Sequence, residues 1–506
     1  MSCGKWKSLA ALLVFAVAGC TGHSIAGPGP WPTTRYPGAR LMSRPLAEAA
    51  AAGITKIDHV VIVTQENRSF DSYFGTYPGA VGLGPKRDWP CLPDLHGACV
   101  RPHHVRADVA AGGPHSYAAY LTDVHSGADD GFVATAAAAK TDCANITAPA
   151  CGFSAPSEVM GYYNGHELPN YWAYARHFVL QDHFFEAANS WSMPQHLYLV
   201  AGWSAKCATH APASCRPDHE LYQELATHKR LNFAFTDITY LLHEYGVSWR
   251  YYVELGPTPD CDNPGAVSCH LPFQAARRPG IWNPLPQFDT VHEDRQVHNV
   301  VNASRFFPAA LHGQLPAVSW VIPNGVDSEH APARVSDGQA WVTRIVNAVM
   351  RGPDWKSTAI FLNWDDWGGY YDGVLPPSVD TQGYGFRVPA LVISPYARVG
   401  HVDHAVLSTD AYLRFIEDRW LNGQRLDPRT DGRPDPRPDV REDANVLGDL
   451  LTAFNFRQKP LPPLILPQRP QTDLVEPLGF PTSRQECSQA CLDAAVGLVP
   501  TPLPTP

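Results

Sequence analysis

The sequence predicts an α/β fold with a largely parallel central sheet. Short, near-continuous apolar runs rich in β-branched and aromatic residues recur along the chain, as expected of strands buried on both faces of a parallel sheet. Longer helix-like stretches alternate with these runs, which favours a doubly wound architecture. The 506 residues suffice for one large domain with insertions or for two domains of ordinary size.

The elements can be assigned in chain order. The predicted strands are HVVIVT (59–64), FVLQ (178–181), VSWRYYV (247–253), AVSWVIP (317–323), TAIFLNW (358–364) and PALVISP (389–395). The predicted helices are DGQAWVTRIVNAVMRG (337–352) and STDAYLRFIEDRWLNG (408–423). Ser408 or Thr409 is the expected N-cap of the second helix, and Gly423 its end. We expect the Gly-, Pro- and His-rich regions 80–165 and 203–300 to be excursions from the sheet.

Residues 1–19 have the pattern of an export signal. Two lysines precede an apolar run that is too short to span a bilayer, and small residues follow. The ending VAGC resembles a bacterial lipobox, so Cys20 is the expected lipid-modified N-terminus of a lipoprotein in the bacterial cell envelope, periplasmic or extracellular. The alternative is an ordinary secretory signal with a chance cysteine. Residues 20–55 would then be a tether, and no other stretch suggests a transmembrane helix.

Closely spaced cysteine pairs support export independently, because disulfides persist in oxidising compartments. Four pairs have the same separation and bracket Pro-, Ala- or Gly-containing stretches, so we expect them to staple surface loops. Zinc is less favoured, since its cysteine ligands are usually closer together and occur with a second matched pair. The expected pairs are Cys91 with Cys99, Cys143 with Cys151, Cys207 with Cys215, Cys261 with Cys269, and Cys487 with Cys491.

Charge and the C-terminal composition set further limits. The net charge is −10 and the sequence has no dense Lys/Arg run, so nucleic acid is not an expected partner. Nothing in the sequence indicates an obligate protein partner. Residues 56–465 are the expected functional domain. The Pro-rich extension 466–506 is expected to wrap it as an extended strap and to end without order.

Polar side chains follow two of the predicted strands. Glu66 and Asn67 come after the first strand, and Asp365 and Asp366 after the fifth. In open α/β sheets, functional groups gather beyond the carboxyl ends of strands. Adjacent carboxylates repel each other unless they are solvated or share a cation. An isolated Asp-Asp pair would be a helix cap or an exposed turn, but the second polar strand end favours a metal site. Carboxylate and amide oxygens suit Mg²⁺, Ca²⁺ or Mn²⁺ better than Zn²⁺.

Ser192, His115 and His330 are ambiguous on their own. Ser192 in NSWSMPQHLYLVAG is as consistent with a helix cap as with a catalytic group. His115 and His330 lie in expected loops of a chain with 22 histidines, where a surface or structural role is the ordinary interpretation.

Several segments together resemble a known family. They are QENRSFDSYFGTYPG, MGYYNGHELPNYWAYARHFVLQDHFF, SMPQHLYLVAG, LPAVSWVIPNG with EHAP, and AIFLNWDDWGGYYDGV. In this order they are similar to the bacterial phosphoesterase family of phospholipases C and an acid phosphatase, whose core is similar to that of alkaline phosphatase and the sulfatases. The resemblance covers residues from about 56 to 465 and implies an alkaline phosphatase-like α/β/α sandwich.

The resemblance also implies roles for individual residues. The implied ligands of one divalent metal ion are Glu66, Asn67, Asp365 and Asp366. The implied nucleophile is Ser192, and the implied phosphate-facing histidines are His115 and His330. Relatives often have a histidine where this chain has Gly373, which leaves rate and substrate preference open.

The expected function is therefore a metal-dependent phosphoric ester hydrolase that forms a phosphoseryl intermediate. Its partner would be a phosphorylated small molecule or a phospholipid. A phospholipase C is one alternative, although Tyr162, Tyr163, Tyr171, Trp172 and Trp191 are better explained as core than as an apolar mouth. A non-catalytic solute-binding lipoprotein of the envelope is another.

Overall fold

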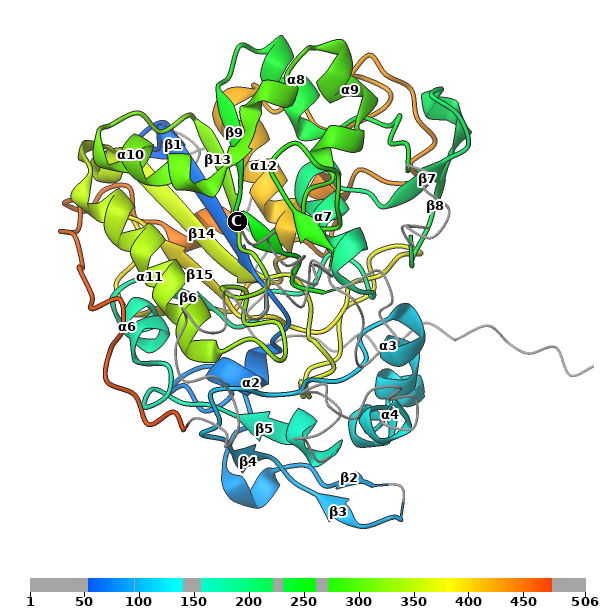
Figure 1. The fold of residues 1–506 in the computed structure, drawn as a ribbon, viewed down its shortest axis with the longest axis vertical. Coiled ribbons are helices and arrows are strands. Elements are labelled where there is room, and N and C mark those ends of the chain that lie inside the picture. Colours follow the sequence, from blue (N-terminus) through cyan, green and yellow to red (C-terminus); the bar gives the residue numbers. More distant parts are fainter. Residues whose placement is uncertain (1–52, 95, 140–155, 222–230, 261–271, 476–506) are drawn as a thin grey trace, which may run out of the picture. The chain divides into compact units, whose positions relative to one another are not determined.

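A central sheet of eight strands organises the protein (Figure 1). The computed structural model describes residues 53–94, 96–139, 156–221, 231–260 and 272–475. The strands of the sheet are β1 (His59–Gln65), β6 (Val179–Gln181), β9 (Trp249–Val253), β12 (Val300–Asn302), β13 (Val318–Ile322), β14 (Thr358–Trp364), β15 (Ala390–Ile393) and β16 (His401–Asp403).

The strand order is β12-β9-β13-β1-β14-β15-β6-β16. Neighbours pair in parallel except at β15, which is antiparallel to both β14 and β6. All six predicted strands are confirmed. β12 and β16 were not predicted, because a three-residue strand at a sheet edge carries too little apolar pattern to detect. Since every strand but β15 points the same way, their carboxyl ends meet at one edge of the sheet.

Helices cover both faces of the sheet. They are α2 (Phe70–Phe74), α3 (Tyr117–Val124), α4 (Phe132–Ala139), α6 (Pro169–His177), α7 (Ser192–Ala201), α8 (Ile238–Glu244), α9 (Asp289–Glu293), α10 (Phe306–Leu311), α11 (Val335–Arg351) and α12 (Thr409–Trp420). α11 contacts α10 and α6, whereas α7 contacts α12 and α8. Figure 1 shows these two groups on opposite sides of the sheet. The predicted α/β/α sandwich is confirmed.

The two predicted helices begin and end close to the expected residues. α11 starts two residues early and ends at Arg351. α12 is capped by Ser408, whose hydroxyl oxygen accepts a hydrogen bond from the Asp410 backbone at 3.2 Å. α12 ends at Trp420, and Gly423 follows with a φ of 78°.

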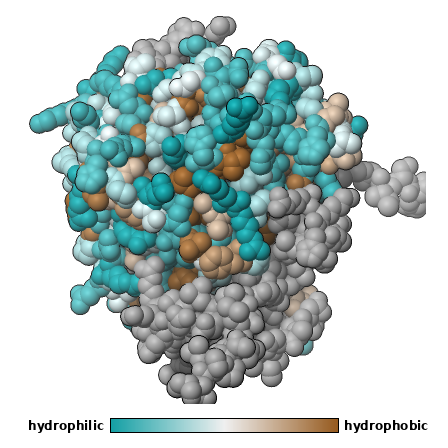
Figure 2. Space-filling view, turned by 45° about the horizontal axis from the view of Figure 1, so that its top comes forward, coloured by the Kyte–Doolittle hydropathy of each residue, from teal (hydrophilic) through white to brown (hydrophobic). Residues whose placement is uncertain are grey.

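Most aromatic side chains considered for an apolar mouth belong to the core. Tyr163, Tyr171 and Trp191 are buried in the main core, and Trp172 packs partly buried against it. Tyr162 is buried in a second, smaller cluster. On the face shown in Figure 2, hydrophilic residues predominate and hydrophobic ones lie among them. Among the described helices, none has both the length and the hydrophobicity needed to cross a bilayer.

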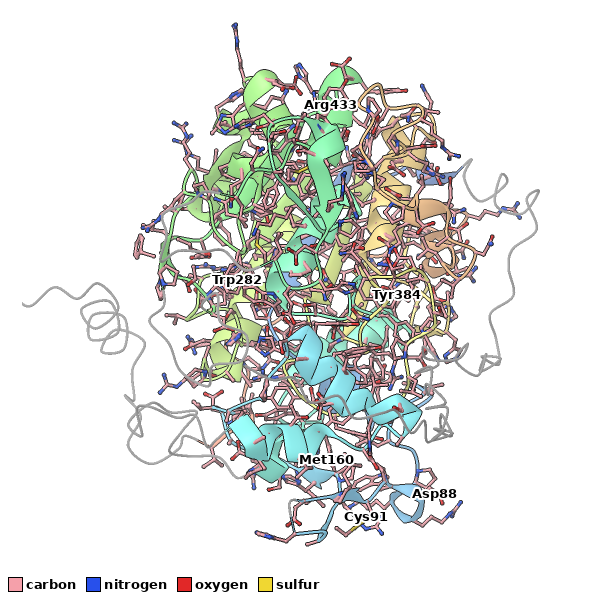
Figure 3. All side chains as sticks on the ribbon, turned by 90° about the vertical axis from the view of Figure 1, so that its right-hand side faces the viewer. Asp88, Cys91, Met160, Trp282, Tyr384 and Arg433 are labelled. Carbon is pink, nitrogen blue, oxygen red and sulfur yellow. A yellow bond between two sulfur atoms is a disulfide. The ribbon has the colours of Figure 1, made fainter. Side chains whose placement is uncertain are left out.

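Small two-stranded sheets project from the central one. They are β2 (Leu92–Pro93) with β3 (Cys99–Val100), β4 (His103–His104) with β5 (Gly161–Tyr162), β7 (Ala205–Cys207) with β8 (Cys215–Pro217), and β10 (Gly256–Pro257) with β11 (Phe273–Gln274). The predicted disulfides Cys91–Cys99 and Cys207–Cys215 are formed. Figure 3 shows Cys91 near Asp88, at the end of the domain opposite Arg433. The other predicted cysteine pairs lie outside the described residues: Cys143 with Cys151, Cys261 with Cys269, and Cys487 with Cys491.

The chain after α12 returns across the helices of one face. The Leu466 backbone exchanges two hydrogen bonds with the Asn347 side chain of α11, at 2.7 and 3.1 Å. Asn170 of α6 donates to the Pro467 carbonyl oxygen at 2.7 Å. This part of the chain therefore runs as an extended strap, as far as the description reaches at Val475. Cys20 and residues 476–506 lie outside the described residues.

Candidate active site

The four predicted metal ligands meet where β1 and β14 end. These strands are adjacent and parallel, and their last residues, Gln65 and Trp364, are paired in register. The residues that follow therefore emerge side by side. The Asp365 backbone N–H donates to the Gln65 carbonyl oxygen at 2.9 Å, and the Asn67 backbone N–H donates to Asp365 Oδ1 at 3.1 Å. The parallel register thus brings together residues almost 300 positions apart.

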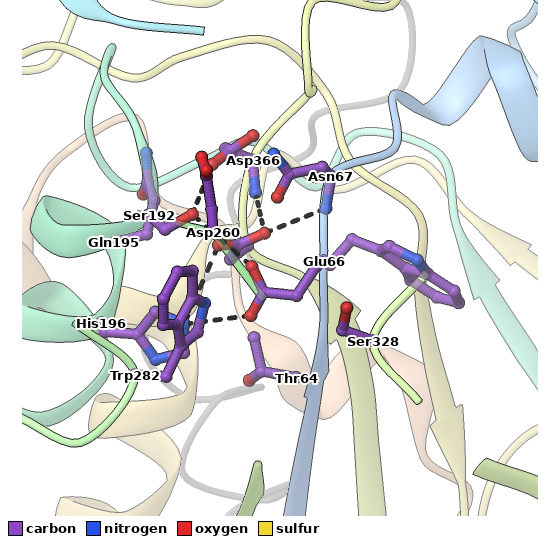
Figure 4. Close-up of polar contacts among 12 residues, drawn as sticks. Thr64, Glu66, Asn67, Ser192, Gln195, His196, Asp260, Trp282, Ser328 and Asp366 are labelled. Carbon is purple, nitrogen blue, oxygen red and sulfur yellow. Dashed lines mark hydrogen bonds and ion pairs between the residues drawn. The ribbon is translucent and has the colours of Figure 1, made fainter. Parts of the chain in front are cut away.

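Ser192 points into the same place from the first turn of α7. Its hydroxyl lies 3.1 Å from Asp366 Oδ2 and 3.5 Å from Glu66 Oε2. Figure 4 shows Ser192 and His196, both from α7, directed toward Glu66 at the end of β1. His196 Nε2 lies 3.5 Å from Glu66 Oε1 and 3.8 Å from Asp365 Oδ2. One serine and one histidine thus face carboxylates from two strands.

The carboxylates of this cluster are buried and close to one another. Glu66 and Asp366 have no exposed surface, and Asp365 is 4% exposed. Burial, together with the neighbouring Asp365 and Asp366, raises the pKa of Glu66 well above its usual range. Burial and Asp365 do the same for Asp366. Anionic groups so placed destabilise one another unless a cation offsets their charge. An exposed turn at Asp365-Asp366 is therefore excluded.

The residues present fit a divalent cation. Several buried atoms that could bind one have no hydrogen-bond partner: Glu66 Oε1, Asn67 Oδ1, Asp365 Oδ2 and His196 Nε2. Ligand atoms of Glu66, His196 and Asp365 lie within 4.8 Å of one another. Burial lowers the pKa of His196 to about 4, so its imidazole is neutral and able to bind a metal.

His196 was missing from the predicted ligand set, which contained only oxygens. A signal for it exists in the sequence, because residues four apart on a helix share a face and His196 follows Ser192 by four. An imidazole ligand favours Zn²⁺, whereas the carboxylate ligands favour Mg²⁺, Ca²⁺ or Mn²⁺. The identity of the metal stays a prediction.

Two glycines let the loop after Asp366 approach the turn after β1. Gly368 has a φ of 59°, and a Cβ added there would lie 2.7 Å from Asn67 Cβ. A Cβ on Gly369, which has a φ of 74°, would lie 2.5 Å from Gly113 Cα. The Gly113 carbonyl oxygen in turn lies 3.0 Å from His115 Nδ1. The glycine pair thus packs the aspartate loop against both the Asn67 turn and the His115 loop.

His115 and His330 form a second group beside the first. Their ring centroids are 5.7 Å apart, and Asp260 Oδ2 lies 3.5 Å from His115 Nε2 and 3.3 Å from His330 Nε2. Asn67 Nδ2 lies 3.1 Å from His115 Nε2 and joins the two groups. Burial opposes the charge of His115, but Asp366 and Asp260 outweigh it and raise the pKa of this histidine to about 10. The surroundings of His115 therefore favour positive charge, carried by a proton or by an ion.

Asp260 was not predicted, and the sequence holds no signal for it. It follows β10 in a loop that shows no metal-ligand spacing with the other site residues. Gly373, where relatives often have a histidine, belongs to a separate network of hydrogen bonds and ion pairs. The Gly373 backbone N–H donates to Asp71 Oδ2 at 2.9 Å, and Asp71 and Asp372 both pair with the buried Arg387.

Comparison with known proteins shows the family of the chain. The profile of the Phosphoesterase family matches residues 57–421, which is most of the chain and contains all the residues of both groups. The chain belongs to the phosphoesterase family.

Individual relatives share about a quarter of their aligned residues with this chain. Non-hemolytic phospholipase C of Pseudomonas aeruginosa is 25% identical over 468 residues, covering 83% of this chain and 60% of that protein. Phospholipase C B of Mycobacterium tuberculosis is 26% identical over 460 residues, covering 81% and 80%. The chain thus spans about 60% of the length of the Pseudomonas relative.

Replacing Gly368 with alanine should weaken metal binding through the Asn67 turn. The change adds a Cβ 2.7 Å from Asn67 Cβ at a φ of 59°. Gly84→Ala is the matched control, because its φ is 65° but nothing lies within 4 Å of the added Cβ. Both variants bear a backbone cost of about 1 kcal/mol. We expect a loss of Mn²⁺ affinity of about tenfold or more in isothermal titration for Gly368→Ala alone. Equal affinities in the two variants would contradict the packing role.

Proposed function

We propose that this protein is a metal-dependent phosphoric ester hydrolase with Ser192 as its nucleophile. The observation that carries the proposal is the position of the Ser192 hydroxyl, 3.1 Å from Asp366 and 3.5 Å from Glu66. A buried serine that only capped a helix would gain nothing from lying between two buried carboxylates whose pKa values are both raised. Membership of the phosphoesterase family supports the same function.

The residues around Ser192 prepare it for attack. A divalent cation held by Glu66, Asp365 and His196, with Asn67 and Asp366 beside it, would lower the pKa of the serine hydroxyl. The hydrogen bond to Asp366 fixes the direction of that hydroxyl. Ser192 is also the first residue of α7, so the positive end of the helix dipole favours negative charge at its oxygen.

The second group faces the phosphoryl oxygens. Ser192 Oγ would attack phosphorus in line, the leaving-group oxygen would depart with its electron pair, and water would later hydrolyse the phosphoseryl ester. Asn67, His115 and His330 would meet the negative charge on the phosphoryl oxygens. His115 and His330 are 6% and 8% exposed, whereas Glu66 and Ser192 are fully buried, so substrate would enter from the histidine side.

The leading substrate class is a phosphorylated small molecule. A phospholipase C is the second candidate, because the curated relatives bear that name. The large hydrophobic side chains exposed in the described part come from separate elements and define no apolar mouth: Val81, Leu121, Tyr245, Leu255, Leu311, Val399, Ile465 and Val475. A solute-binding lipoprotein would need no serine between carboxylates, so this alternative is disfavoured.

We also propose that the protein is an exported lipoprotein anchored through Cys20. The lysines, the short apolar run and the VAGC ending support this location. The two disulfides of the described part agree with an oxidising compartment.

Substitution of the nucleophile is the direct test of the reaction. Ser192→Ala should reduce hydrolysis of p-nitrophenyl phosphate and of p-nitrophenyl phosphorylcholine by on the order of 10³-fold or more. Ser190→Ala is the control, because the Ser190 hydroxyl is also buried but has no hydrogen-bond partner in the described structure. Circular dichroism should show both variants folded.

The same assay is then run after chelation. We expect activity to vanish and to return on adding back one of Mg²⁺, Ca²⁺, Mn²⁺ or Zn²⁺. Full activity of Ser192→Ala, or of the chelated wild type, would rule out the proposed mechanism. The relative rates on the two esters separate phosphatase from phospholipase C preference.

Lipidation is tested by Cys20→Ser in a bacterial host fed radiolabelled palmitate. We expect the label and the membrane association to be lost, because the thiol that accepts the lipid is gone. Cys3→Ser is the control, since Cys3 lies in the signal that would be removed. Label retained by Cys20→Ser, or lost by Cys3→Ser, would contradict the anchor.

A further inference from the structure

Three clusters in the described part of the chain bring ligand atoms of His, Asp or Glu within 4.8 Å of one another. The first is the group of Glu66, His196 and Asp365. The second is His115 with Asp260 and His330. The third is Asp182 with His183 and His404. The interatomic distances divide these clusters into two kinds.

The third cluster is held by ordinary hydrogen bonds. His183 Nδ1 lies 2.7 Å from Asp182 Oδ1, and His404 Nδ1 lies 2.8 Å from Asp182 Oδ2. The Val81 backbone N–H donates to the same carboxylate at 2.8 Å. These are the lengths of charge-assisted hydrogen bonds, with protons between the atoms. The Asp182 cluster is therefore complete without a metal.

The second cluster is spaced differently. Asp260 Oδ2 lies 3.5 Å from His115 Nε2 and 3.3 Å from His330 Nε2. Both distances exceed the roughly 2.7–2.9 Å of a charge-assisted hydrogen bond. They match the separation of about 3.3 Å between two ligands of a tetrahedral ion whose bonds are about 2.0–2.1 Å long. The cluster around Glu66 is also spaced more widely than a charge-assisted hydrogen bond, at 3.5 and 3.8 Å from His196.

The second nitrogen of each histidine is already occupied. His115 Nδ1 lies 3.0 Å from the Gly113 carbonyl oxygen, and His330 Nδ1 lies 2.8 Å from the Ala331 carbonyl oxygen. A carbonyl oxygen can only accept, so Nδ1 donates in both rings, and Nε2 is the atom that faces Asp260 and would bind an ion in exchange for any proton it carries. Backbone carbonyls hold metal-binding histidines in this way. His330 Nε2 is buried and has no hydrogen-bond partner in the described structure.

We propose that His115, Asp260 and His330 form a second metal site, suited to Zn²⁺, beside the Glu66 site. Two imidazoles and one carboxylate are a frequent ligand set of catalytic zinc, which leaves a fourth position for water or substrate. Asn67 Nδ2 now lies 3.1 Å from His115 Nε2, a contact that the bound ion replaces.

A second ion also changes how the two histidines act on the substrate. They hold an ion against the phosphoryl oxygens instead of donating hydrogen bonds to them. Two ions flanking one phosphoryl group stabilise the attacking and the leaving oxygens together. This role rests on the proposed function, but the existence of the site does not, because it is read from metal content.

The test measures the number of zinc ions bound per chain of the full-length protein. After chelation, saturation with Zn²⁺ and removal of excess, elemental analysis should find about two equivalents per chain in the wild type. The double variant Asp260→Ala with His330→Ala should keep one, as should Glu66→Ala with His196→Ala. The control His404→Gln, in the Asp182 cluster, should keep two.

Co²⁺ substitution of the wild type covers the case in which the variants do not fold. In a titration with Co²⁺, two equivalents should bind per chain. The visible absorption should be that of a tetrahedral site containing histidine. One equivalent of zinc in the wild type would overturn the second site and leave Asp260 as the counter-charge of protonated histidines. Two equivalents retained without Asp260 and His330, or one lost in His404→Gln, would also overturn it. A wild type that binds two equivalents of zinc but hydrolyses neither ester would count against the proposed function and not against this site.

Discussion

Mutual repulsion of buried carboxylates is the constraint on which the site depends. Glu66, Asp365 and Asp366 emerge from adjacent parallel strands whose last residues are in register, so their approach is a consequence of the sheet itself. Burial denies them water, and the raised pKa values of Glu66 and Asp366 express the cost. Positive charge from a bound cation would remove that cost, so we expect metal binding to stabilise this region.

The backbone segments around these carboxylates lie unusually close to one another. Asn67 takes up a φ of 52°, which is uncommon for a residue other than glycine. Gly368 and Gly369 let the aspartate loop touch the Asn67 turn and the His115 loop without side chains in between. The backbone thus accepts strain in order to bring the two groups of functional residues together. A deep group around Ser192 and a shallower group around Asp260 result, with Asn67 between them.

The sequence predicts the parts of this arrangement that depend on local pattern. The near-continuous apolar runs of six strands are evident, and so are the polar residues that follow β1 and β14. Ser192, His115 and His330 stand out only through the family resemblance, because a serine at a helix start and two loop histidines have ordinary structural explanations.

Two residues were missed for different reasons. His196 could have been found from its helical spacing with Ser192, whereas Asp260 could not. Asp260 lies close to His115 and His330 only in the folded chain, and no local pattern in the sequence encodes that proximity. Likewise, β12 and β16 are strands because of their neighbours and not because of their own three residues.

The most direct measurement is the position of a bound ion. Crystals of the protein grown with Mn²⁺ and measured near the manganese absorption edge should give an anomalous peak about 2.0–2.3 Å from carboxylate oxygens of Glu66 and Asp365 and next to Ser192 Oγ. A peak elsewhere, or none between these side chains at saturating Mn²⁺, would contradict the account that the ends of β1 and β14 and the start of α7 together form a metal site.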